Sequence, residues 1–443
     1  MEDQMLNAIR EKLGDAIQAP FPTLVRRDAS PALLRGKAQA VVGMRRAGKT
    51  FFLYQCLADR LARGVERERL VYFNFEDERL GPLQAEDLGA ILEEYYRRFP
   101  KFRRLAEVTW CFDEIQVVSG WERFIRRVLD LEKVEVFLSG SSARMLSREV
   151  ATSMRGRAME TVITPFSFRE FLRGRGWPGG APGRLVSGAE RSALRAHFDD
   201  YLEIGGFPEA GAFPAARDRV GLLQSYVDAV LFRDVAERYG VSNLPALRAF
   251  VRQLLRHPAT LLSVSKTYGD FASRGIAASK ETLLAFLAHL EDAFLVFTLP
   301  LAGQSERQRQ VNPRKLYLAD HGLAQAFSPA PGLDRGRLIE NVVACELSRA
   351  SRDLAYAKTA SGLEVDFVAT DFAGRRELIQ VAADISSPAT FAREIRALNE
   401  ARQAFPDATA FLLTETEPPR GVRAPAEIKT VPVWHWLLRH ELR

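Results

Sequence analysis

A short segment near the start of the chain has the residue types that bind nucleotide phosphates. Residues 43–50, GMRRAGKT, match the pattern GxxxxGK(S/T). They follow the apolar stretch 38–42 and open an amphipathic helical pattern, which is the context that this motif requires. The glycines let the backbone curl so that N–H groups face phosphate oxygens, and the helix N-terminus adds a favourable dipole. A chance glycine-rich turn is the alternative, and the flanking elements argue against it.

Individual positions of this phosphate-binding loop have distinct expected tasks. Lys49 would reach the β- and γ-phosphates, and Thr50 would ligate Mg²⁺. Five further residues in or next to the loop are predicted to contact the nucleotide: Gly43, Arg46, Ala47, Gly48 and Phe51. The loop therefore predicts a nucleotide and Mg²⁺ as cofactors.

A second motif consists of two carboxylates at the end of the apolar stretch 108–112. Asp113 would hold the magnesium shell, and Glu114 would polarise the attacking water. An acidic pair in this position is by itself often only a helix N-cap. One intervening strand, 70–75, separates it from the phosphate-binding loop, and this order favours hydrolases with a catalytic glutamate over adenylate-kinase-like transferases.

Polar and basic residues follow the fourth expected strand. A polar side chain at its tip, assigned to Ser141, would hydrogen-bond the γ-phosphate or the attacking water; a plain turn is the equally weighted alternative. Arg155 and Arg157 are predicted to reach the γ-phosphate of a neighbouring subunit and to stabilise charge in the transition state. The sequence does not choose between these two arginines, and a solvated basic loop is the alternative.

The elements that must position these residues alternate between strand and helix over the first 200 residues. This order predicts a parallel sheet covered by helices. The expected strands are 38–42, 70–75, 108–112, 134–138 and an edge strand at 161–163. Helical segments follow to about residue 290, and from about residue 333 the pattern becomes helix, strand, strand, helix, strand. We therefore predict three domains, at residues 1–205, 206–330 and 331–443.

With these features, the chain resembles the prokaryotic AAA-superfamily ATPases that join a P-loop module to a winged helix and a C-terminal domain of restriction-endonuclease-like fold. Besides the P-loop, the resemblance rests on more specific strings: RRD at 26–28, NFED at 74–77, FDEIQ at 112–116, GSS at 140–142, GR at 156–157, PFSFREF at 165–171, GGFPE at 205–209, EVDFV at 364–368 and IQV at 379–381. It covers nearly the whole chain. It implies an α/β fold with an AAA-like parallel sheet, ATP hydrolysis and a ring-like assembly.

The middle of the chain fits a helix-turn-helix. A helix at 265–272 is followed by a glycine-containing turn and a second helix, Lys280–Asp292, which Ser279 would cap. Residues 294–299 and 315–318 would form a wing. The second helix would enter a DNA major groove with Lys280 near its N-terminus. The alternative is a lid that only packs on the ATPase, and the scarcity of basic residues on this helix slightly favours it.

The C-terminal segment resembles the PD-(D/E)XK nuclease core, which needs a helix glutamate, two strand carboxylates and a lysine. Glu340 and Asp366 match two of these positions. Gln380 and Ala382 stand where the family pattern has a carboxylate and the lysine, and neither can perform that task. We therefore expect no nuclease activity and interpret the domain as a retained fold that serves DNA binding or subunit contacts.

Composition limits the partners of the chain. Its net charge of +6 over 443 residues is a mild bias, compatible with nucleic-acid binding but not evidence for it. A cluster that includes Arg97, Arg98 and Lys101 is a candidate DNA contact; a solvated helix face partly neutralised by Glu93 and Glu94 is the alternative. No apolar run reaches the ~20 residues that cross a bilayer, and the acidic start lacks a secretory signal. We expect a cytoplasmic protein without a membrane partner.

The leading hypothesis from the sequence is an ATP-hydrolysing, DNA-binding motor that forms a homo-oligomer, expected to be a ring, and acts on duplex or branched DNA. Two alternatives stay open: a non-motor regulatory or defence ATP switch, and an ATP-dependent nuclease.

Overall fold

The computed structural model describes residues 2–140, 154, 156–177, 187–303, 313–328, 334–416 and 423–439. The chain forms two compact units. The first comprises residues 1–164 with 292–294, and the second comprises residues 165–291 with 295–443. Among the helices in the described ranges, none combines the length and hydropathy needed to cross a lipid bilayer.

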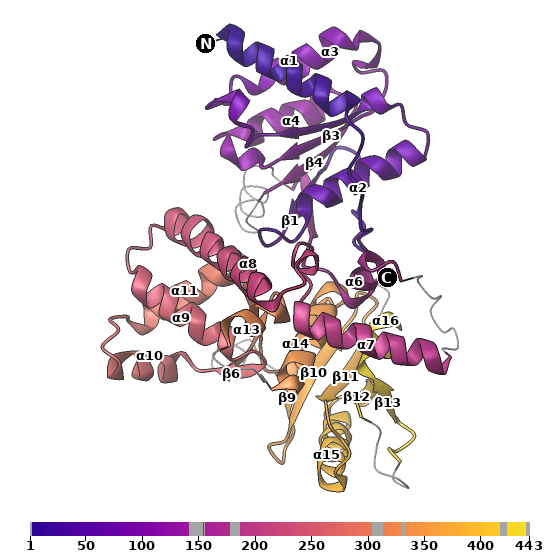
Figure 1. Ribbon diagram of the computed structural model, residues 1–443, viewed down its shortest axis with the longest axis vertical. Coiled ribbons are helices and arrows are strands. Elements are labelled where there is room, and N and C mark those ends of the chain that lie inside the picture. The colour runs from indigo at the N-terminus through magenta and orange to yellow at the C-terminus, as the bar shows by residue number, and fades with distance from the viewer. Residues whose placement is uncertain are drawn as a thin grey trace. The chain divides into compact units, whose positions relative to one another are not determined.

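The first unit is built around a five-stranded parallel sheet (Figure 1). Its strand order is β2-β3-β4-β1-β5, so β5 lies at an edge and β1 lies next to it. The strands are β1 (Ala38–Val42), β2 (Leu70–Asn74), β3 (Val108–Asp113), β4 (Val134–Ser139) and β5 (Ala158–Val162). All pairings are parallel. The predicted parallel α/β sheet is thus confirmed, and the segment expected at an edge, 161–163, overlaps β5, one of the two edge strands.

Helices cover both faces of this sheet. They are α1 (Glu2–Gln18), α2 (Lys49–Ala62), α3 (Leu88–Arg98) and α4 (Trp121–Leu131). One apolar core joins residues of α1, α3 and α4 to the strands, including Ile9, Tyr95, Trp110 and Phe124. On the other face, α2 packs against β1 to β4. Every residue of β1 and β3 is buried, including the polar Gln39, Thr109 and Asp113, as expected for strands covered by helices on both faces.

The second unit contains a three-stranded antiparallel sheet with helices beside it. The sheet has the order β6-β8-β7, with β6 (Thr260–Leu262), β7 (Val296–Leu299) and β8 (Arg314–Leu318). The preceding helical part consists of α8 (Ala216–Ala229), the π-helical segment η6 (Val230–Glu237), α9 (Leu244–Arg256), α10 (Val264–Ser273) and α11 (Lys280–Asp292). Helices α10 and α11 therefore coincide with the two segments predicted to be the helices of the helix-turn-helix. The winged-helix assignment itself stays a prediction.

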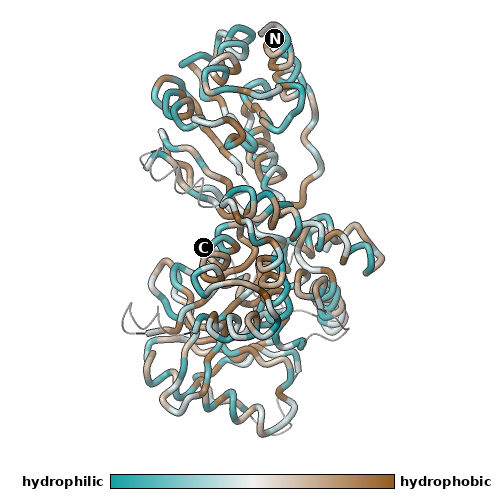
Figure 2. Tube along the Cα trace, turned by 90° about the vertical axis from the view of Figure 1, so that its left-hand side faces the viewer, coloured by the Kyte–Doolittle hydropathy of each residue, from teal (hydrophilic) through white to brown (hydrophobic). Residues whose placement is uncertain are grey.

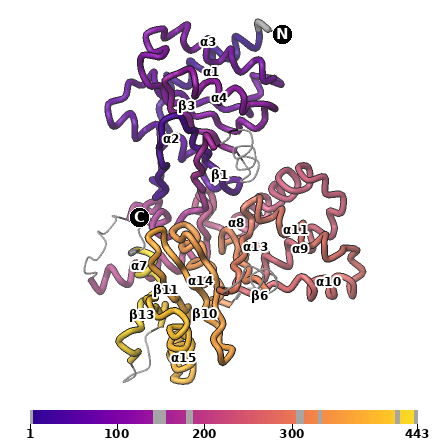
Figure 3. The backbone as a smooth tube through the Cα atoms, turned by 180° about the vertical axis from the view of Figure 1, so that it is seen from behind, coloured from indigo at the N-terminus to yellow at the C-terminus, as the bar shows by residue number. Residues whose placement is uncertain are grey.

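A five-stranded mixed sheet forms the rest of the second unit. Its order is β13-β12-β11-β10-β9, with β9 (Asp353–Lys358), β10 (Glu364–Thr370), β11 (Arg376–Ala382), β12 (Thr409–Thr414) and β13 (Ile428–Pro432). The helices are α13 (His321–Phe327), α14 (Arg335–Ala350), α15 (Pro388–Ala404) and α16 (Val433–Arg439). Figures 1 and 3 show α14 lying against β10 and β11. The predicted order was incomplete, because three strands precede α15 and a strand and helix follow β12.

The boundary between the two units differs from the predicted one. Helices α6 (Phe168–Gly174) and α7 (Gly188–Ile204), which the sequence assigned to the first domain, belong to the second unit. The buried rings of Phe168 on α6 and Tyr201 on α7 pack in a tilted arrangement with centroids 5.6 Å apart, and the Arg169 guanidinium makes an ion pair with Glu346 on α14 at 2.8 Å. Both units carry apolar residues, brown in Figure 2, interspersed with hydrophilic ones, teal. The predicted division near residue 330 remains a prediction.

Candidate active site

The phosphate-binding loop connects β1 to α2 in a strained, tightly turned conformation. Gly43 has φ 145° and Gly48 has φ 99°, so both lie where L side chains are rarely found. A Cβ atom at Gly43 would overlap the carbonyl oxygen of Ile163. Arg46 also has a positive φ, 65°, and it is exposed to solvent. The motif therefore has the glycines its local backbone requires.

The Lys49 side chain lies within this loop and is 6% exposed as a residue. Its Nζ donates to the carbonyl oxygens of Gly43 at 3.0 Å and Met44 at 3.2 Å. The ammonium group is thus held against the backbone of the loop. Phe51, which follows Thr50 on α2, is 52% exposed.

Asp113 is the centre of a hydrogen-bonded network at the carboxyl ends of β2, β3 and β4. Its Oδ2 accepts from Thr50 Oγ1 at 2.8 Å and from the Tyr72 hydroxyl at 2.6 Å. Its Oδ1 accepts from Ser139 Oγ. Burial, and next the Asp113 charge, raise the pKa of Tyr72, so this phenol stays a donor. The network fixes the two residues predicted to hold Mg²⁺ next to each other.

Glu114 follows Asp113, the last residue of β3, and has a positive φ of 55°. Its N–H donates to Ser139 Oγ at 3.1 Å, and its carboxylate accepts from the Gln116 amide. Burial raises the pKa of Glu114, with the Lys49 charge acting in the opposite direction and Asp113 adding to the increase. A partly desolvated carboxylate close to a cation is suited to accept a proton from water.

Arg27 donates hydrogen bonds that hold the phosphate-binding loop. It was not predicted as a site residue from the sequence. The residue is 6% exposed, and one of its Nη atoms donates to the Ala47 carbonyl at 2.8 Å. The other donates to the carbonyl of Thr164, just past β5. One guanidinium thereby ties the phosphate-binding loop to the sheet edge. Arg27 was visible in the sequence only as part of the string at 26–28.

The residues of this site fit a nucleoside triphosphate with Mg²⁺. The loop has no room for a side chain at Gly43, its lysine is buried against it, and the Thr50 hydroxyl touches a carboxylate. Hydroxyl and carboxylate oxygens are the protein ligands that Mg²⁺ takes. The bound ion would neutralise phosphate charge, while Glu114 would orient and deprotonate water.

Other predicted site residues are placed less favourably or not at all. Ser141 and Arg155 lie outside the described residues. Arg157 makes an ion pair with Asp130 on α4 within the same chain, and these side chains are 42% and 54% exposed. Whether Arg157 serves a neighbouring subunit stays a prediction.

The basic residues predicted to contact DNA are partly engaged by the protein. Arg97 pairs with Glu94 at 2.8 Å, and Lys101 pairs with Glu66 at 3.4 Å. The Arg98 guanidinium lies 5.7 Å from the centre of the Phe99 ring. Lys280 Nζ lies 5.6 Å from the Tyr268 ring centre. These contacts agree with the alternative of a charge-paired surface for the 97–101 cluster.

The predicted nuclease-like residues come together around a lysine that the sequence analysis did not single out. Lys315 Nζ on β8 lies 2.7 Å from Glu340, 2.6 Å from Glu364 and 2.8 Å from Asp366. The Asp366 backbone N–H donates to the Gln380 side chain at 3.2 Å. The ammonium group occupies the space among the carboxylates, where a nuclease of this type would bind its metal ion. A divalent ion therefore does not fit this arrangement of the residues.

Comparisons with known proteins agree with the ATPase geometry. Residues 35–172 match a family model described as an AAA domain, and residues 195–334 match a domain of unknown function, DUF8612. An uncharacterized protein of Methanocaldococcus jannaschii is 30% identical over 427 residues, covering 94% of this chain and 92% of that protein. The chain belongs to the family of this archaeal protein. The part of the chain that carries the phosphate-binding loop, residues 35–172, is thus an AAA-type domain.

More distant relatives are also similar to the chain. An uncharacterized protein of Haemophilus influenzae is 27% identical over 348 residues, which cover 78% of this chain and 82% of that protein. Among solved structures, the Walker-type ATPase of Pyrococcus abyssi is 14% identical, with a TM-score of 0.43, and the match covers 72% of this chain and 94% of that one.

Proposed function

We propose that the chain is a Mg²⁺-dependent ATPase that works as a DNA-binding oligomeric motor on duplex or branched DNA. The observation that supports hydrolysis best is the contact of Thr50 with Asp113 beside Glu114, opposite the lysine of the phosphate-binding loop. Two carboxylates thus have separate tasks: Asp113 holds the ion, and Glu114 acts on water.

The assembly part of the proposal depends on an arginine supplied by a neighbouring subunit. Arg155 and Arg157 remain the candidates. The pair of Arg157 with Asp130 does not argue against this role, because an exposed ion pair is worth only about 0–1 kcal/mol. Arg157 can therefore leave Asp130 at little cost when a neighbour's nucleotide is in reach.

A regulatory or defence switch is the second candidate, and one observation favours it. The 97–101 cluster is engaged by neighbouring acidic and aromatic side chains, which lowers the charge it offers to DNA. Nuclease activity is the third candidate, and Lys315 among the three carboxylates argues against it.

The deciding experiment measures ATP turnover by the full chain with and without single-stranded, duplex and four-way DNA. Stimulation by one of these DNAs, together with strand or junction movement, supports the motor. ATP turnover that no DNA alters would favour the regulatory switch. Metal-dependent DNA cleavage that survives the Lys49→Ala substitution would favour the nuclease.

A further inference from the structure

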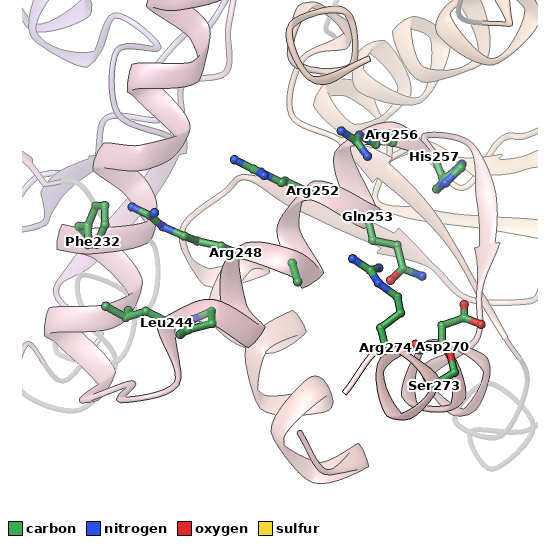
Figure 4. Close-up of a pocket in the computed structure, with 12 residues that line it drawn as sticks. Phe232, Leu244, Arg248, Arg252, Gln253, Arg256, His257, Asp270, Ser273 and Arg274 are labelled. Atoms are coloured by element: carbon green, nitrogen blue, oxygen red, sulfur yellow. Dashed lines mark hydrogen bonds between the residues drawn. The ribbon is translucent and has the colours of Figure 1, made fainter. Parts of the chain in front are cut away.

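Helix α9 carries three arginines on one side. Arg248, Arg252 and Arg256 are four residues apart, so they follow one another at intervals of about 6 Å along the helix. All three line a cavity of about 870 Å³, and Arg274, at the end of α10, lines it too. Figure 4 shows the three residues succeeding one another along α9, with Arg274 reaching towards Gln253. We call this cavity and its four arginines the α9 groove.

Within the described part of the chain, these guanidinium groups lack acidic partners. In the ranges that the structure describes, none of the four arginines of the α9 groove takes part in an ion pair. The Arg248 guanidinium lies 4.8 Å from the Phe232 ring centre, and Arg256 Nε donates to the Phe327 carbonyl at 3.0 Å. Arg252 and Arg274 are exposed.

The surroundings of the groove are also basic. Two adjoining hollows share lining residues with it and add Lys266, Arg337 and Asp228, while Asp270 lies in the groove itself. Because Arg337 pairs with Asp334 at 3.5 Å, six basic and three acidic side chains give this region a formal charge of +3. The pKa of His257 is lowered by burial and then by the charges of Arg337, Arg256 and Lys266, as a positive field requires.

A row of arginines without acidic partners has a specific chemical use. Guanidinium groups bind phosphate oxygens through two parallel N–H donors, and they are less strongly hydrated than ammonium groups. The row from Arg248 to Arg256 extends about 12 Å, which suits several successive phosphates of one strand better than a single small anion. By contrast, the exposed positions near the start of α11 are Lys280, Glu281, Leu284 and Ala285, which offer little net charge.

We propose that the α9 groove binds the sugar-phosphate backbone of DNA and that α9, rather than α11, is the main contact helix of this chain. The proposal deepens the proposed function, because it rests on DNA being the partner and names the surface that holds it. Contacts to phosphates carry no base information, so this binding is sequence-independent and strongly weakened by salt.

The test uses the full chain with Arg248, Arg252 and Arg274 each replaced by Gln, which removes three charges and leaves the Arg256 backbone contact intact. The matched control replaces Arg97, Arg98 and Lys101 by Gln, removing the same charge from the other candidate surface. Fluorescence anisotropy measures binding to labelled duplex, single-stranded and four-way DNA at about 50 and about 200 mM salt, with a non-hydrolysable ATP analogue. ATP turnover without DNA reports that both variants are folded.

The groove variant should bind DNA at least about 100-fold more weakly than wild type at about 50 mM salt, whereas the control should stay close to wild type. Losing three phosphate contacts should reduce the steepness of log affinity against log salt by about 2.7. Between the two salt concentrations, the factor by which the affinity of the variant falls should therefore be about 40 times smaller than the factor for wild type. Equal binding by wild type and groove variant would overturn the groove while leaving the DNA partner in place. Wild-type protein that hydrolyses ATP but binds no DNA would overturn both. If the wild-type protein bound polyglutamate as tightly as it binds DNA, the assignment of the groove to DNA would be overturned.

Discussion

Lys315 holds together three carboxyl groups from two elements of the second unit, of which Glu340 is protonated near neutral pH, and its replacement by Met should destabilise that unit strongly. Met keeps the length of the aliphatic chain and removes only the charge and its donors. The Lys315 side chain is 4% exposed, and each of its three oxygen partners lies within hydrogen-bonding distance. Burial by itself would lower the pKa of Lys315, but the charges of Asp366, Glu340 and Glu364 raise it above its ordinary value. The lysine is therefore charged in the folded state.

The size of the effect follows from what remains after the substitution. Removing one partner of a buried ion pair costs about 3–5 kcal/mol, because the other charge stays buried without compensation. Here Glu364 is 31% exposed and can reach water, whereas Asp366 is only 8% exposed. We therefore expect a loss near the lower end of this range, about 3 kcal/mol. Adding Asp366→Asn to Lys315→Met should recover part of the loss, since it removes the more deeply buried uncompensated charge.

Urea unfolding near neutral pH, followed by tryptophan fluorescence, measures the free energy of unfolding. Hydrogen exchange locates the effect, which should appear in peptides of β10 and β11 and not in those of β1 and β3. The matched control is Lys429→Met, an exposed lysine on β13 of the same unit. If Lys315→Met unfolded within about 0.5 kcal/mol of that control, the ammonium group would not be compensating the carboxylates as argued.

Three further outcomes follow from the structure. Lys49→Ala should weaken ATP binding and abolish ATP turnover. Glu114→Gln should still bind ATP but lose at least about 100-fold in turnover, because an amide cannot take a proton from water. Wild-type turnover by Glu114→Gln in a steady-state assay would refute the role of Glu114 as the base. Burial, and next the Asp366 charge, raise the pKa of Glu340 from 4.5 to about 8, so between these pH values the folded chain holds a proton that the unfolded chain has lost, and stability decreases as pH rises. Glu340→Gln mimics the protonated carboxyl, so it should gain stability relative to wild type as pH rises from about 5 to about 8, by about 1.4 kcal/mol for each pH unit. If thermal unfolding showed a constant difference in stability between the variant and wild type across this range, the raised pKa of Glu340 would be contradicted. Finally, mixing inactive Arg155→Ala/Arg157→Ala protein with inactive Lys49→Ala protein should restore part of the ATPase activity if a neighbour supplies the arginine, and a fully active monomer in sedimentation would exclude this.

Much of the ATPase site could be predicted because its signals are local in the chain. The glycines of residues 43–50 and the strands on either side are set by backbone geometry within a few residues. The carboxylates at the end of β3 follow from the same strand pattern. The side chains that complete the site are different. Tyr72 reaches Asp113 across 41 residues, and only the pairing of β2 with β3 brings the two together.

The α9 arginines are an intermediate case. Their spacing of four residues is visible in the sequence and predicts one helix face. Their lack of acidic partners within the described ranges is a property of the folded surface, as is the pairing that engages the 97–101 cluster. Both segments are rich in basic residues, so composition alone could not rank them.

By itself, the sequence determined the phosphate-binding loop, the parallel sheet that carries it and the acidic pair, because each depends on backbone conformation and hydrophobic pattern over short distances. Only the tertiary structure decided how charges pair. Lys315 meets Glu364 and Asp366 at separations of 49 and 51 residues, from a strand of a different sheet. The strength of such a contact depends on distance through space and on exclusion of water, and neither quantity is encoded in the local pattern of the chain.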